Sequence, residues 1–153
     1  MNIIDAMYYQ TLSPEKLSEL ILDIIKGFED TNIRKINYYD IFLIIPYYTY
    51  TPVKDVFERI KFNSNISFQN KVERNPQLCA NFEYRYKEVS KYIKKALLYM
   101  ISNGIVKIDN NLILTSKNKI SINNKAIYNI ARIFSIKQTA LLYSFLKVDI
   151  DDI

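Results

Sequence analysis

The sequence predicts a mainly α-helical fold that contains a winged-helix-like unit of two helices and a short β-hairpin. Three observations support this fold class. The 153 residues include only two glycines and four prolines, too few for the turns of a multi-stranded sheet. Apolar residues recur at helical spacing after clear helix-start signals. Hydrophobic residues make up 49% of the chain, so we expect one core and a single domain over residues 1–153.

The first predicted helix covers residues 14–28. Ser13 is a typical N-cap, and Pro14 is favoured at the first helical position. Gly27 lies near the end of the segment. The apolar positions that follow the cap share one helical face, which predicts that this face is buried: Leu17, Leu20, Ile21, Ile24, Ile25 and Phe28.

The next predicted elements are short. Residues 38–45 form an apolar run that fits either a short helix or a buried strand, and we expect Pro46 to end it. A second pairing of cap and proline predicts a helix over residues 51–60. Residues 62–70 are polar and rich in asparagine, which is typical of a linker.

Residues 75–115 form the predicted winged-helix-like unit. Asn75 is the expected N-cap of its first helix, and Pro76 is the expected first-turn residue. Phe82 lies on the apolar face of that helix. A second helix over residues 90–103 would occupy the recognition position of a winged helix.

The end of the second helix also carries a structural signal. Gly104 stands where a left-handed backbone conformation favours glycine. Residues 105–108 and 111–115 flank the turn-forming pair Asp109-Asn110 and predict the hairpin that forms the wing. Two further helices are expected over residues 125–134 and 137–146.

The composition leaves few options for catalysis. The chain has no histidine and one cysteine, Cys79, so it offers no Cys/His zinc site and no histidine-activated nucleophile. A lone cysteine fits a reducing compartment, and we expect Cys79 to fill space in the core. The start lacks a signal-peptide pattern, and the longest apolar-rich run, residues 41–53, is too short to span a bilayer. We expect a cytoplasmic protein with no catalytic residue, metal, cofactor or small-molecule substrate, and no membrane partner.

Positive charge is concentrated in the middle of the chain. Residues 54–148 carry a net charge of +11, whereas the whole chain carries +5. On a continuous helix, one basic stripe would be formed by four lysines: Lys87, Lys91, Lys94 and Lys95. Such a stripe is either a contact surface for an acidic partner or nucleic acid, or an ordinary solvated helix face. The candidate contact residues are Arg85, Lys87, Lys91, Lys94, Lys95 and Lys107.

Tyrosine is unusually frequent, with 13 residues. Tyrosine is enriched at protein interfaces because a large apolar ring carries a polar tip. Core packing with a solvated hydroxyl is the alternative. The candidates for a partner interface cluster around the first two apolar segments: Tyr38, Tyr39, Tyr47, Tyr48 and Tyr50.

Several short motifs follow one another along most of the chain: Ser13-Pro14, Lys26-Gly27-Phe28, Ile41 to Ile45, Thr51-Pro52-Val53-Lys54, Asn75-Pro76 with Phe82 and Arg85, Lys94 with Ala96-Leu97 and Gly104, Ile130-Ala131-Arg132 with Phe134, Thr139, and Leu146-Lys147-Val148. In the order and spacing of these motifs the chain resembles the middle component of bacterial three-component ABC-type systems, the group that includes Lamassu anti-phage defence. Ile93 and Lys95 depart from the resemblance, which implies a threonine and an acidic residue at these two positions.

The resemblance implies a non-catalytic adaptor subunit. In such systems the middle component joins an SMC- or Rad50-like ATPase to an effector, a nuclease in many cases, rather as a kleisin uses its winged-helix end. Residues 75–115 are then expected to meet the ATPase, and the N-terminal helix with the tyrosine-rich segment another partner. DNA contact would be secondary. The alternative from the basic stripe is a free-standing winged-helix DNA-binding regulator, and an enzyme acting on small molecules is the third and weakest hypothesis.

Overall fold

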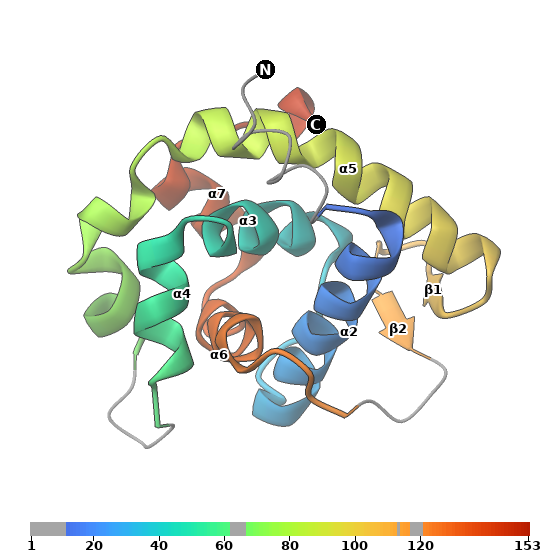
Figure 1. The fold of residues 1–153 in the computed structure, drawn as a ribbon, viewed down its shortest axis with the longest axis horizontal. Coiled ribbons are helices and arrows are strands. Elements are labelled where there is room, and N and C mark those ends of the chain that lie inside the picture. Colours follow the sequence, from blue (N-terminus) through green and yellow to red (C-terminus); the bar gives the residue numbers. More distant parts are fainter. Residues whose placement is uncertain (1–11, 62–66, 113, 117–120) are drawn as a thin grey trace.

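The computed structural model describes residues 12–61, 67–112, 114–116 and 121–153 and is mainly helical (Figure 1). The two strands pair antiparallel, with Lys107 opposite Thr115. The mainly α fold with a small β-hairpin is thus confirmed. The described elements are α2 (Pro14–Thr31), α3 (Tyr38–Tyr48), α4 (Thr51–Glu58), a π-helical turn (Gln69–Glu73), a 3-10 helix (Pro76–Cys79), α5 (Phe82–Ser102), β1 (Val106–Ile108), β2 (Leu114–Ser116), α6 (Lys125–Phe134), α7 (Thr139–Leu146) and a 3-10 helix (Ile150–Asp152).

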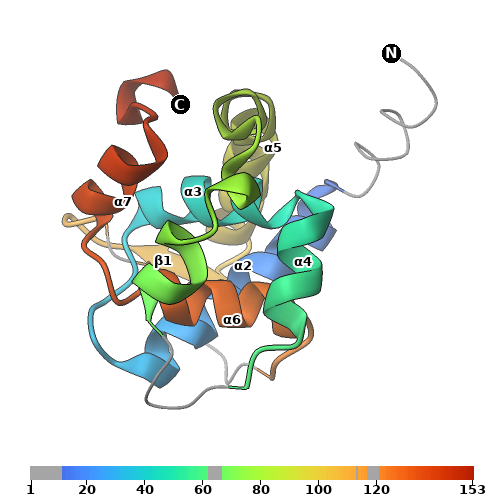
Figure 2. The same cartoon turned by 90° about the vertical axis from the view of Figure 1, so that its left-hand side faces the viewer.

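Helix α3 lies at the centre of the fold. Both views place it between α5 on one side and α6 on the other (Figures 1 and 2). Every residue from Asp40 to Tyr47 is buried. Helices α2 and α4 flank α6, and α5 packs across α2 and α3. The apolar run that sequence could assign to either a helix or a strand is therefore the core helix.

Two local signals explain where α3 begins. The Asn37 side chain accepts a hydrogen bond from the backbone N–H of Tyr39, and the Asp40 carboxylate accepts one from the N–H of Asn37. This reciprocal arrangement is a capping box, which satisfies backbone donors that a helix start leaves without partners.

The expected end of α3 at Pro46 is wrong, because the helix continues to Tyr48. Proline lacks the N–H that would bond the carbonyl four residues earlier, and its ring crowds that carbonyl, so it disfavours a helix at this position. Tyr47 packs in the core with its ring 5.8 Å from Phe57 and 5.1 Å from Phe134. This packing outweighs the local signal.

The division of residues 75–103 into two long helices is also wrong. A short 3-10 helix precedes one continuous helix, α5, of 21 residues. Ser90, which marked the start of the second predicted helix, instead donates its hydroxyl to the carbonyl of Tyr86 one turn earlier. Val89 and Ser90 are both buried, so the apolar face runs through the expected break.

The hairpin follows α5 as expected. Gly104 has a φ of 68°, the left-handed conformation predicted for it. The extended segment before α3 joins the hairpin, since Tyr38 N–H donates to the Leu112 carbonyl at 2.6 Å and Leu114 N–H donates to the Ile36 carbonyl at 3.3 Å. The extended segment between α2 and α3 therefore pairs with the β1–β2 hairpin.

Candidate protein-docking surface

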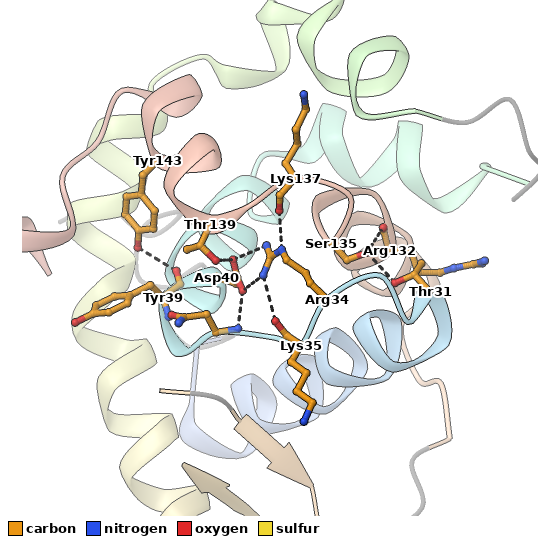
Figure 3. A network of polar contacts seen from close by, with 11 residues as sticks. Thr31, Arg34, Lys35, Tyr39, Asp40, Arg132, Ser135, Lys137, Thr139 and Tyr143 are labelled. Atoms are coloured by element: carbon orange, nitrogen blue, oxygen red, sulfur yellow. Dashed lines mark hydrogen bonds and ion pairs between the residues drawn. The ribbon is translucent and has the colours of Figure 1, made fainter. Parts of the chain in front are cut away.

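An ion pair between Arg34 and Asp40 lies at the centre of a polar network that joins several segments (Figure 3). The two guanidinium NH groups donate to the two carboxylate oxygens at 2.7 and 2.9 Å. Asp40 is fully buried, and the Arg34 side chain is 11% exposed. A buried carboxylate of this kind needs a bidentate partner to offset its desolvation.

The rest of the network joins distant segments. Thr139 donates its hydroxyl to Asp40 at 2.9 Å, and Arg34 Nε donates to the Lys137 carbonyl at 2.6 Å. Tyr143 donates its hydroxyl to the Tyr39 carbonyl at 3.0 Å (Figure 3). Both Asp40 oxygens are fully engaged, so this network fixes the α6–α7 turn against α3 and leaves no oxygen for a ligand.

Asp23 is a second buried carboxylate that the sequence did not single out. It accepts the backbone N–H groups of Asn123 and Asn124 at 3.1 and 2.8 Å, and so caps the segment that leads into α6. Burial raises its pKa, and the two amides oppose that effect. It lines a hollow of about 410 Å³ together with Tyr48 and Lys54. Asp23 belongs to none of the sequence motifs. Its position beside the apolar face of α2 was the only sequence signal that its side chain is buried.

The predicted tyrosine interface is not one surface. Tyr47 is fully buried, so it is a core residue and cannot contact a partner in this conformation. Tyr38 and Tyr39 are half-buried at the start of α3, with ring centroids 5.3 Å apart. The Tyr48 hydroxyl accepts a hydrogen bond from the Asn124 side chain at 2.8 Å. The ring of Tyr50 lies beneath the Arg85 guanidinium.

Arg85, expected to contact a partner or nucleic acid, is instead directed into the fold. Its NH1 donates to the carbonyls of Pro46 and Tyr47 at 2.6 and 3.2 Å. Other guanidinium nitrogens donate to the carbonyls of Leu78 and Ala80. A cation at the C-terminus of α3 satisfies carbonyls that the helix leaves free and complements the helix dipole. Arg85 therefore fixes α5 against the end of α3.

The same region contains the other three members of the Asn-Pro motif: Asn75, Pro76 and Phe82. Asn75 makes no N-cap hydrogen bond, contrary to expectation; its side-chain amide donates back to the carbonyls of Asn70 and Lys71. Pro76 does open a helix, but a 3-10 helix of four residues. Phe82 is buried at the start of α5, as expected, and lies 5.5 Å from the Arg85 guanidinium.

The remaining predicted contact residues stay on the surface of the molecule. With about 100° between successive residues, one exposed set on α5 falls within an arc of about 100°. We call it the α5 outer face: Tyr84, Lys87, Lys91, Lys94, Lys95 and Leu98. The opposite side of α5 packs on α2 and α3, and Lys107 is exposed on β1.

The lysines of the α5 outer face differ in their partners. Lys87 bonds Glu83 at 3.1 Å, which raises the pKa of the lysine, and Lys91 lies 3.6 Å from Glu88. Within the described part of the chain, neither Lys94 nor Lys95 contacts a carboxylate. Tyr84 and Leu98 are 65% and 67% exposed, high values for large apolar side chains. The α5 outer face thus combines uncompensated charge with exposed apolar area.

Among the described residues, no other cluster of side chains is suited to bind a metal ion or to react. Over these ranges no group of three or more cysteine, aspartate or glutamate side chains could hold a metal ion. Cys79 is half-buried against the core, and burial raises the pKa of its thiol, which keeps it in the unreactive protonated form. No described helix has both the length and the apolar content needed to cross a bilayer.

Comparison with known proteins gives one match. Residues 1–150 match the family described as ABC-three component (ABC-3C) system Middle Component 3. Neither the curated proteins nor the solved structures contain a match. Because the match spans almost the whole chain, the protein belongs to the Middle Component 3 family of ABC-three component systems.

Proposed function

We propose that this protein is a non-catalytic adaptor that joins an SMC- or Rad50-like ABC ATPase to an effector, a nuclease, in a Lamassu-like anti-phage system. Membership of the Middle Component 3 family supports a role inside a multi-component ABC system. The observation that carries the adaptor role is the α5 outer face, where lysines and large apolar side chains project from one rigid helix. Exposed large apolar side chains rimmed by charged ones are typical of a protein-interaction surface.

A winged-helix DNA-binding regulator is the second candidate. Lys94 and Lys95 favour this candidate, because they lie on α5. This helix directly precedes the hairpin, as the recognition helix of a winged helix precedes its wing. One observation opposes this candidate. Arg85, the one arginine of α5, is engaged with backbone carbonyls and is not available to read bases.

Co-expression tests the adaptor role. The tagged chain is produced together with the ATPase and the effector of its own system, and proteins that co-purify are identified. The adaptor role predicts that both components are recovered with the tagged chain. If neither is recovered at low ionic strength, the proposal is wrong.

A further inference from the structure

We infer that the α5 outer face binds an acidic amphipathic helix of a partner protein, an inference that rests on the adaptor function proposed above. The α5 outer face is long enough to contact several turns of a partner helix. Tyr84 and Leu98 are 14 residues apart, which corresponds to about 21 Å along the helix axis. The lysines lie between them. A partner helix would place apolar residues near both ends and carboxylates between.

Helix α5 is already anchored to the core before a partner binds its outer face. Arg85 fixes the first turns of α5 to the end of α3, and Tyr86, fully buried, donates its hydroxyl to the Asp149 carbonyl at 2.8 Å. Met100 is fully buried near the other end of the helix. Since both ends of α5 are anchored in the core, binding orders only the exposed side chains of this protein, which lowers its entropic cost.

Charge indicates an acidic partner. The face carries four lysines, and the flanking Glu83 and Glu88 compensate Lys87 and Lys91 only. Lys94 and Lys95 remain as the uncompensated pair, one turn from Leu98. Glutamate or aspartate side chains on the partner would meet this pair beside an apolar contact, an arrangement that sets orientation and suppresses wrong partners.

Apolar exposure favours a protein over nucleic acid. A phosphate backbone engages lysine ammonium groups but offers nothing to cover Leu98 or Tyr84. A helix with its own apolar residues would remove both from water, and Tyr84 has the large area and polar tip common in interface hot spots. The two most exposed large apolar side chains of the described chain both lie on this face.

Binding of the two other components, each purified alone, tests the inference. Lys94→Glu with Lys95→Glu, and separately Leu98→Asp, are expected to weaken binding of one component by at least about tenfold. Matched controls change charge and polarity elsewhere: Lys61→Glu with Lys125→Glu, and Leu141→Asp on α7. The controls should stay within about twofold of the native chain. Native-like affinity in both α5 variants overturns the docking surface.

A photo-crosslinking amino acid at Leu98 gives a measurement that does not depend on loss of binding. The expected product joins Leu98 to a partner peptide rich in aspartate and glutamate. Cross-linking from Leu141 but not from Leu98 contradicts the inference. Circular dichroism of every variant shows that α5 is still folded.

The outcomes separate the docking surface from the adaptor function. If neither component binds the native chain, the adaptor function fails. If a component binds the native chain and both α5 variants equally, only the docking surface fails. A DNA duplex of about 20 base pairs is the third probe. Tight duplex binding that Lys94→Glu with Lys95→Glu abolishes identifies nucleic acid as the occupant and overturns the inference.

Discussion

At the residue scale, Arg85 shows how a charged side chain can serve the fold. Sequence placed it on a basic surface because arginine is usually solvated. Two of the carbonyls that it satisfies belong to residues 38 and 39 positions earlier, and no local pattern indicates such a contact. Asp40 differs, because the Asn37-x-x-Asp40 spacing of a capping box was readable in the sequence.

Arg85→Ala is expected to lower the free energy of unfolding by about 3 kcal/mol, since charged hydrogen bonds to several carbonyls are lost at once. Arg85→Lys should recover only part of this, because one ammonium cannot replace the guanidinium fork. Urea unfolding measures both. Arg59→Ala, at an exposed position after α4, is the control and should cost less than about 0.5 kcal/mol. An equally small effect at Arg85 contradicts its structural role.

For Tyr47 we predict a substitution that raises, rather than lowers, the free energy of unfolding. Its ring is fully buried, and within the described ranges its hydroxyl has no hydrogen-bond partner. Burial raises the pKa of this phenol. Tyr47→Phe should therefore raise the free energy of unfolding by about 1 kcal/mol, because an unsatisfied buried group is removed.

Tyr143→Phe is the matched control for Tyr47. The Tyr143 hydroxyl donates to the Tyr39 carbonyl, so its removal should cost about 1 kcal/mol. A clear loss of stability on Tyr47→Phe would mean that its hydroxyl is bonded in solution.

At the element scale, the cap of α2 was predictable, the cap expected at Asn75 was wrong, and helix continuity could not be predicted. The start of α2 follows the sequence signals, with Ser13 accepting the Lys16 N–H at 3.3 Å behind Pro14. The helices around Pro46 and Ser90 run on where local signals indicated breaks. In both cases buried neighbours stabilise a conformation that propensity alone does not favour. The hairpin and Gly104 were predictable because turn chemistry is local.

The crossing of α2 and α6 depends on one glycine. A Cβ atom at Gly27 would lie 2.8 Å from both the Ala131 Cβ and the Tyr128 carbonyl oxygen. Gly27→Ala should lower the free energy of unfolding by about 1–2 kcal/mol, although alanine favours a helix by about 1 kcal/mol. Differential scanning calorimetry measures the change. Adding Ala131→Gly should restore part of the loss, and independent effects of the two substitutions would contradict the close approach.

At the scale of the whole molecule, charge and packing separate two roles of α5. One side of the helix completes the core with α2 and α3, and the other carries the α5 outer face. Sequence correctly grouped the four lysines on one face because helical periodicity is a local property. It did not identify Tyr84 and Leu98 as part of that face, since exposure of apolar side chains depends on which neighbours the fold supplies.

The tyrosines show that closeness in sequence does not place side chains on one surface. They were grouped by their proximity in sequence, but the fold distributes them between the core and separate parts of the surface. Tyr47 packs with Phe134, a residue from the other end of the chain. Proximity along the chain could not predict that partner.

The central claim is that this chain bridges two proteins, and sedimentation velocity tests it most directly. The ATPase and the effector of the same system are mixed at equal concentration, with and without this protein. The adaptor account predicts that the two sediment separately alone and as one faster species when the chain is added. Lys94→Glu with Lys95→Glu should prevent the shift, and Lys61→Glu with Lys125→Glu should not. An ATPase–effector complex that forms equally well without this protein would contradict the account.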